Sequence, residues 1–256
     1  MGDIAPPDYL VRVKEDYLHG GSDFFRSYEP EEMLAIMDEH GVEKAVISIG
    51  GDDDNRRPFD FVERFPERFA LAVNVNPLGF MKDLWRLESM TRNYPVALAR
   101  IVPFGIQLAP SDAAYYPVYA KCIELDLALS INTGLPGPPV PGACQDPMHL
   151  DVVCFRFPDL KLCMAHGADP WWGVAIRLMI KYRNLHLMTS AYSPKRLPAE
   201  LVHFMNTRGQ DKILFASDHP VLSFERCLAE AEALPLREGV LEKYLRANAL
   251  AYFRWD

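Results

Sequence analysis

Residues 160–166 read Leu-Lys-Leu-Cys-Met-Ala-His, an apolar run of strand length that ends on a histidine. Apolar side chains fill both alternating positions of most of this run, which is typical of strands buried on both faces of a parallel sheet. A loop follows, and residues 172–181 then show a helical pattern. A strand followed by a helix is therefore the unit to look for in the rest of the chain.

The same unit recurs along the chain. Similar runs start at residues 42, 69, 96, 127, 184 and 212, so that neighbouring runs begin 24 to 33 residues apart. This spacing suits a strand, a crossover helix and two loops. The other strands are predicted at 42–48, 69–75, 96–102, 127–133, 184–190 and 212–218. Helices are predicted at 31–40, 80–90, 115–125, 172–181 and 198–207, and the stretch 224–253 is expected to be rich in helix.

The pattern predicts an α/β fold, a (β/α)₈ TIM barrel, because a chain of 256 residues has the usual size of one such barrel. We expect a single domain over 1–256, with an irregular N-terminal segment at 1–28. The runs supply seven strands, whereas a closed barrel has eight. The helix at 31–40 precedes the first run, so a strand is expected before residue 30, and 9–13 (Tyr-Leu-Val-Arg-Val) is the candidate. Otherwise the strand has been lost or the given chain begins after it.

Composition limits the partners. The formal net charge of −8 argues against a nucleic-acid partner, and we find neither a signal peptide nor a membrane-spanning segment. We therefore expect a cytoplasmic enzyme with a small-molecule substrate and the possibility of a homodimer. The five cysteines lack the spacing of structural zinc or a disulfide framework, and Cys163 is expected to be a core residue.

Functional residues of a barrel lie at the carboxyl ends of its strands and in the loops that follow. His166 and Asp218 end two of the predicted strands and are the best candidates, as an acid–base pair or as metal ligands. Arg100 lies within a strand, where a buried guanidinium needs an anionic partner, either a protein carboxylate or a substrate carboxylate. The proline-rich loop 134–142 is expected to be functional. The same criterion also selects Asn74, Asn76, Asn132, Ser190, Tyr192 and His219.

The later strand ends together resemble the amidohydrolase-2 family, which includes aminocarboxymuconate-semialdehyde decarboxylase. The resemblance rests on residues 157–172, 184–192 and 212–220, with the terminal Asn-Ala-Leu-Ala-Tyr-Phe at 248–253, and it extends over about residues 29–256. It implies one divalent metal, commonly zinc, held by a His-x-His pair, a further His and an Asp. His166 and Asp218 match the last two, and the family's Asp also takes a proton from the metal-bound water.

The sequence departs from this pattern. It contains no His-x-His, and Asn132-Thr-Gly134 stands where relatives often have His-Thr-Gly. A catalytic zinc site needs three protein ligands, and His166 and Asp218 supply two.

Three hypotheses remain open. The first is an enzyme that hydrolyses or decarboxylates a small cyclic or carboxylated substrate, with Asp218 as general base and His166 as metal ligand or electrophile. In it Arg100 holds a carboxylate, and Asn132, Trp171, Tyr192 and His219 bind substrate. The second is a metal-independent enzyme that uses His166 and Asp218 as an acid–base pair. The third is a catalytically inactive barrel that binds a ligand.

Overall fold

The computed structural model describes residues 8–50 and 55–255. Its centre is one parallel sheet in which the strands follow each other in chain order. Each predicted strand is confirmed at a shorter length than expected, and the last is reduced to two residues. The strands are β1 (Ala45–Ile49), β2 (Phe69–Asn74), β3 (Val96–Ile101), β4 (Ala128–Asn132), β5 (Leu162–Ala165), β6 (Leu185–Met188) and β7 (Ile213–Leu214).

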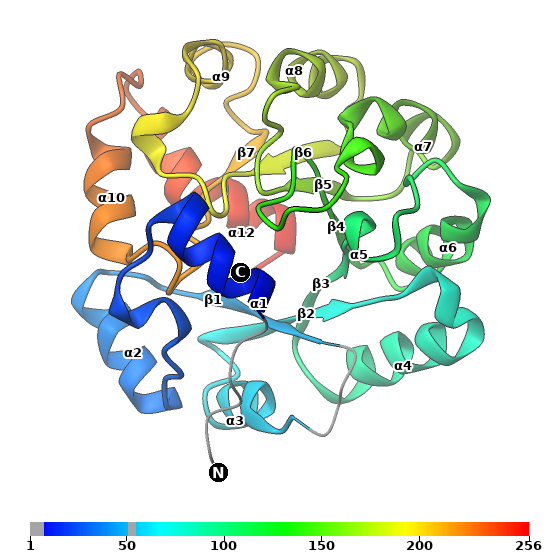
Figure 1. Cartoon of the computed structure of the whole chain (residues 1–256), viewed down its shortest axis with the longest axis horizontal. Helices are drawn as coiled ribbons and strands as arrows, with labels where there is room; N and C mark the ends of the chain where they lie inside the picture. Colours follow the sequence, from blue (N-terminus) through cyan, green and yellow to red (C-terminus); the bar gives the residue numbers. More distant parts are fainter. Residues whose placement is uncertain (1–7, 51–54, 256) are drawn as a thin grey trace.

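Helices form a ring outside the strands (Figure 1), which is the arrangement of a (β/α) barrel. The predicted helices appear as α2 (Pro30–Glu39), α4 (Phe80–Asn93), α6 (Tyr116–Glu124), α8 (Trp172–Lys181) and α9 (Ala199–Met205). Two helices of the ring lie in stretches where none was predicted, namely α3 (Arg57–Arg64) and α7 (Leu150–Arg156). The helix-rich end contains α10 (Phe224–Glu232), α11 (Val240–Glu242), a π-helical turn at Lys243–Ala247 and α12 (Asn248–Phe253).

The predicted strand at 9–13 is wrong. The chain there forms α1 (Asp8–Arg12), followed by a π-helical stretch, Val13–Leu18, and a short 3₁₀ helix, Ser22–Phe25. Asp8 lies in the first turn of α1 and Arg12 in its last, and these charges favour a helix through its dipole. The described residues therefore form seven strands, and β1 and β7 are the two edges of the sheet.

Two cores hold the barrel together. The larger one lies between the sheet and the surrounding helices and is built from apolar residues on the outward faces of the strands. The smaller one lies inside the sheet, where α12 inserts Tyr252 among inward-facing side chains. Those side chains are Ala72, Leu98, Ala128, Cys163 and Leu214. Because side chains alternate along a strand, Arg100 and Ser130 share this inward face with Leu98 and Ala128.

No helix of the described residues is long and apolar enough to cross a membrane. All five cysteines are buried and unpaired, and Cys163 lies in the inner core as predicted.

Candidate functional site

A cavity of about 820 Å³ opens where the inner faces of the strands meet the loops at their carboxyl ends. Ser48, Arg100, His166, Ser190 and Asp218 all line it. These residues come from β1, from β3 and from the ends of three later strands, so the barrel brings together positions as far apart as 48 and 218. The cavity continues inward along Ala72, Leu98, Met188 and Leu214, which give it an apolar wall.

Arg100 points across the inside of the barrel and contacts two other elements. Its Nη2 lies 3.2 Å from Nε2 of His166, and its Nη1 donates to the Ser48 hydroxyl at 3.4 Å. Burial lowers the pKa of the guanidinium, while the nearby negative charge of Asp218 raises it. Among the residues that the structure describes, no carboxylate lies within 4.0 Å of Arg100. The protein-carboxylate partner considered for Arg100 is thus not present in that part of the chain.

His166 follows β5, and a hydrogen bond made by its backbone holds it in place. Its N–H donates to the Ser190 hydroxyl at 3.1 Å. Burial lowers the pKa of the imidazole, Asp218 raises it, and the positive charge of Arg100 lowers it further, with a net lowering. The imidazole ring of His166 is therefore neutral at neutral pH. Its Nδ1 is buried and has no hydrogen-bond partner among the described residues.

Asp218 follows the short strand β7, where it is an exposed residue that lines the cavity. Both Asp218 and His166 have left-handed backbone, with φ of 61° and 65°. Non-glycine residues adopt this conformation rarely, and such residues cluster at functional sites. The positive φ turns each side chain away from the simple alternation of its strand, which the sequence pattern could not show.

His219 also lines the cavity, but aromatic rings surround it. It stacks on Phe224 with ring centroids 4.5 Å apart and contacts Tyr28 at 5.3 Å. Burial lowers the pKa of His219. Neither ring nitrogen has a partner among the described residues. Tyr28 brings the N-terminal segment to the site, and no pattern in the sequence indicated that contact.

The other predicted substrate residues do not line this cavity in the described structure. Asn132 is buried at the end of β4 with its side-chain oxygen unpartnered, and the oxygen of Asn74 at the end of β2 is likewise unpartnered. Trp171 precedes α8, and it is Trp172 that is buried, with its ring 5.2 Å from that of Tyr192. Asn76 caps the turn that precedes α4. Ser48 and Ser130 are lining residues that the sequence analysis did not single out.

The described residues do not fit a divalent metal. They contain no cluster of three or more His, Cys, Asp or Glu side chains that could hold one. Of the two predicted ligands, His166 presents its Nε2 to a guanidinium. Asn132 offers only a neutral amide oxygen.

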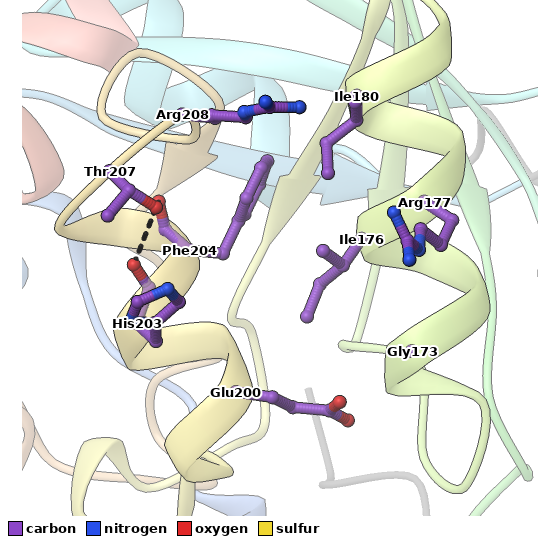
Figure 2. A pocket seen from close by; sticks show the side chains of 9 residues that line it. All are labelled: Gly173, Ile176, Arg177, Ile180, Glu200, His203, Phe204, Thr207 and Arg208. Carbon is purple, nitrogen blue, oxygen red and sulfur yellow. Dashed lines mark hydrogen bonds between the residues drawn. The ribbon is translucent and has the colours of Figure 1, made fainter.

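A second hollow lies on the outside of the barrel, between α8 and α9 (Figure 2). Its volume is about 690 Å³, and Ile176, Ile180 and Phe204 form its apolar part, with Arg177 and His203 at the edges. It contains none of the strand-end residues. The inner cavity is therefore the candidate site.

Comparisons with known proteins agree with the fold. A family model described as amidohydrolase matches residues 14–255. No curated protein matches the chain. An uncharacterised TIM-barrel protein from Bordetella bronchiseptica is similar at 22% identity and a TM-score of 0.76, with 88% of this chain and 82% of that chain covered.

Two decarboxylases are also similar in structure. One is a 2,6-dihydroxybenzoate decarboxylase in complex with 2,6-dihydroxybenzoate, at 17% identity, with 95% of each chain covered and a TM-score of 0.70. The other is a dihydroxybenzoic acid decarboxylase from a Polaromonas species with bound manganese and the inhibitor 2-nitroresorcinol. It has 16% identity and a TM-score of 0.70, with 97% of this chain and 94% of that chain covered. At these identities the likeness shows the fold.

Proposed function

The chain belongs to the amidohydrolase family, and on that premise we propose that it removes the carboxyl group of a small hydroxylated aromatic acid bound in the inner cavity. Arg100 would neutralise the anion, Asp218 would transfer the proton, and His166 would hold Arg100 in position. The alternative within the family is hydrolysis of a carboxylated ring, for which the same three residues would serve.

The observation that carries the proposal is the state of Arg100. Its guanidinium faces the cavity without a carboxylate partner among the described residues. A cation removed from water is unfavourable unless an anion accompanies it. The side chain therefore suits a substrate that carries negative charge. The decarboxylase solved with 2,6-dihydroxybenzoate indicates which acids to test first.

The chemistry requires one proton. In the proposed step, Asp218 passes a proton taken from water to the ring carbon that bears the carboxylate. The bond between that carbon and the carboxylate then breaks, its electron pair restores the aromatic ring, and carbon dioxide leaves. A hydroxyl group next to the carboxylate stabilises the positive charge of the protonated ring. The neutral ring of His166 accepts a hydrogen bond from Arg100 and so holds the guanidinium towards the anion.

The apolar wall of the cavity suits this step. Ala72, Leu98 and Met188 line the inner part of the cavity, where a ring would be buried. An aromatic acid is amphipathic, with an apolar body and a charged end. The cavity offers both kinds of lining, with apolar side chains along the strands and with Arg100 and Asp218 nearer their carboxyl ends.

We expect the chain to convert a member of a panel of 2-hydroxybenzoates and 2,6-dihydroxybenzoates to the corresponding phenol. Loss of the acid is followed by ultraviolet absorbance, and the phenol is identified by chromatography. Asp218→Asn should lower kcat by about 10²–10⁴-fold, the range for removal of a general acid–base group. The isosteric amide preserves shape and tolerates the left-handed backbone.

His203→Gln, on the outer groove, serves as the matched control and should leave kcat unchanged. Turnover by Asp218→Asn at the parent's rate would contradict the proposed role. If parent and Asp218→Asn bind the acids equally well and neither turns them over, the non-catalytic barrel is the better description.

A further inference from the structure

We infer that the guanidinium of Arg100 takes the place of a metal ion in this barrel, so that the cavity binds its organic anion without a divalent cation. The anion-binding part rests on the proposed function. The metal part does not, because it concerns only the chain's own side chains.

The first step is the tautomer of His166. An arginine side chain has hydrogen-bond donors and no acceptor. The contact of 3.2 Å between Arg100 Nη2 and His166 Nε2 is therefore a hydrogen bond in which Nε2 accepts. The ring proton then lies on Nδ1. In this tautomer the one lone pair of the ring is already used, and a metal could bind His166 only after Arg100 moves away.

Electrostatic repulsion also disfavours a metal at this position. A divalent cation at Nε2 of His166 would lie beside a guanidinium that the barrel holds in place, and like charges at short distance repel. Arg100 cannot relieve this by losing its proton, because arginine stays protonated in proteins. Ser48 on β1 and His166 after β5 hold the guanidinium from two sides. Its position is thus built into the fold rather than left to a flexible surface side chain.

The third step is the balance of charge without a metal. Asp218 supplies a negative charge that favours the charged form of Arg100. Yet no hydrogen bond or ion pair within 4.0 Å joins these two described residues. A guanidinium can bind two neighbouring oxygens of an anion at once. The space between the two side chains therefore suits a ligand that offers such a pair of oxygens, as 2-hydroxybenzoate does.

The metal part is tested on protein purified without chelator and without a metal-affinity step. Elemental analysis should find less than about 0.1 equivalent of zinc, manganese, iron or cobalt per chain. Added zinc or manganese should leave the melting temperature unchanged. A near-stoichiometric metal, whose removal by chelator lowers the melting temperature, would overturn the inference whether or not a substrate has been found.

The anion part uses 2-hydroxybenzoate as the probe, in a buffer that contains chelator, with calorimetry as the readout. The parent should bind, and Arg100→Met should weaken binding by at least about tenfold, whereas Arg100→Lys should restore part of it because the charge returns. Arg177→Met, on the outer groove, is the control and should bind as the parent does. Equal binding by the parent and by folded Arg100→Met would overturn this part.

The two proposals fail separately. Absence of turnover with the whole panel counts against decarboxylation, while a metal-free chain that binds the probe through Arg100 still supports the inference. Should Arg100→Met fail to fold, Arg100→Lys and the metal content of the parent decide. Binding by the parent only when manganese is present would overturn the inference outright.

Discussion

We expect the packed ring of His186 to make the stability of this protein sensitive to acid. His186 lies on the inward face of β6, with its ring 4.7 Å from that of Tyr252. Burial, aided by the charge of Lys212, lowers the pKa of His186 from 6.5 to about 4. As the pH falls, His186 therefore binds a proton near pH 6.5 in the unfolded chain but only near pH 4 in the folded chain.

It follows that stability is full above about pH 6.5 and falls as the pH drops towards 4, because the unfolded state then binds more protons. We expect His186 alone to contribute on the order of 3 kcal/mol to this fall in the free energy of unfolding. Urea unfolding at pH 7 and pH 4.5 should show a smaller loss for His186→Phe, which retains an aromatic ring against Tyr252. His203→Gln, an exposed histidine, should behave as the parent. An unchanged pH dependence in His186→Phe would refute the assignment.

At the same scale, the sequence predicted functional roles for polar residues in the strands or at their ends, because packing alone does not explain polar side chains in apolar runs. These residues are Arg100, His166, Asp218 and His219. The sequence could not predict that Arg100 would contact His166, since a side chain of that length can reach several places. That contact depends on the curvature of the sheet and on the left-handed turn at His166. The catalytic roles of these residues stay predictions.

Loops at the carboxyl ends of the strands tie neighbouring elements together. The loop after β4 is fixed to the loop after β5, because the Leu135 N–H donates to the Asp169 carbonyl at 2.8 Å and the Thr133 hydroxyl to the Gly167 carbonyl at 2.6 Å. Gly134 makes this approach possible. Its φ is 84°, and a Cβ there would lie 3.0 Å from the Asp169 nitrogen.

Gly134→Ala should therefore lower the free energy of unfolding by about 1–3 kcal/mol, through backbone strain and the forced separation of the two loops. Gly41→Ala is the control, since Gly41 has a φ of 66° but nothing within 4 Å of its Cβ position. Denaturant unfolding of both variants separates the contact from the strain. Equal losses in the two variants would show that the contact with Asp169 has no effect of its own.

Helices and strands were predictable where the regular spacing of apolar residues extended over a long stretch of sequence. The seven strands and the helices at 80–90 and 172–181 followed from the spacing of apolar residues. Segment 57–64 begins Arg-Pro and is short, so its helical period was missed, although Phe59, Phe61 and Val62 are buried. The prediction for segment 9–13 was wrong for a different reason. Its valines suggested a strand, but a strand also needs a neighbouring strand to pair with. Local helical hydrogen bonds satisfy the backbone there instead.

For the whole molecule, the family match confirms the predicted resemblance, and with it the expectation of a hydrolase or carboxy-lyase. The repeat of strand and helix along the sequence was enough to predict the barrel class. It did not predict the number of strands, because closure of the barrel depends on how the first and last segments pack. In this chain α12 supplies Tyr252 to the inner core, and Ala249 and Phe253 of the same helix line the cavity.

The C-terminal helix therefore acts as the plug of the inner core, and Tyr252 is its central side chain. Tyr252 is 7% exposed, and its hydroxyl has no hydrogen-bond partner among the described residues. Tyr252→Ala should lower the free energy of unfolding by about 3–5 kcal/mol, because it leaves a cavity where the faces of several strands converge.

Tyr252→Phe removes only the unpaired hydroxyl, and a buried polar group without a partner is unfavourable. That variant should be at least as stable as the parent in denaturant unfolding followed by circular dichroism and fluorescence. The two variants together separate packing from polarity. If Tyr252→Phe loses as much stability as Tyr252→Ala, then the hydroxyl makes a bond that stabilises the plug, and the apolar packing of α12 is not what closes this end of the barrel.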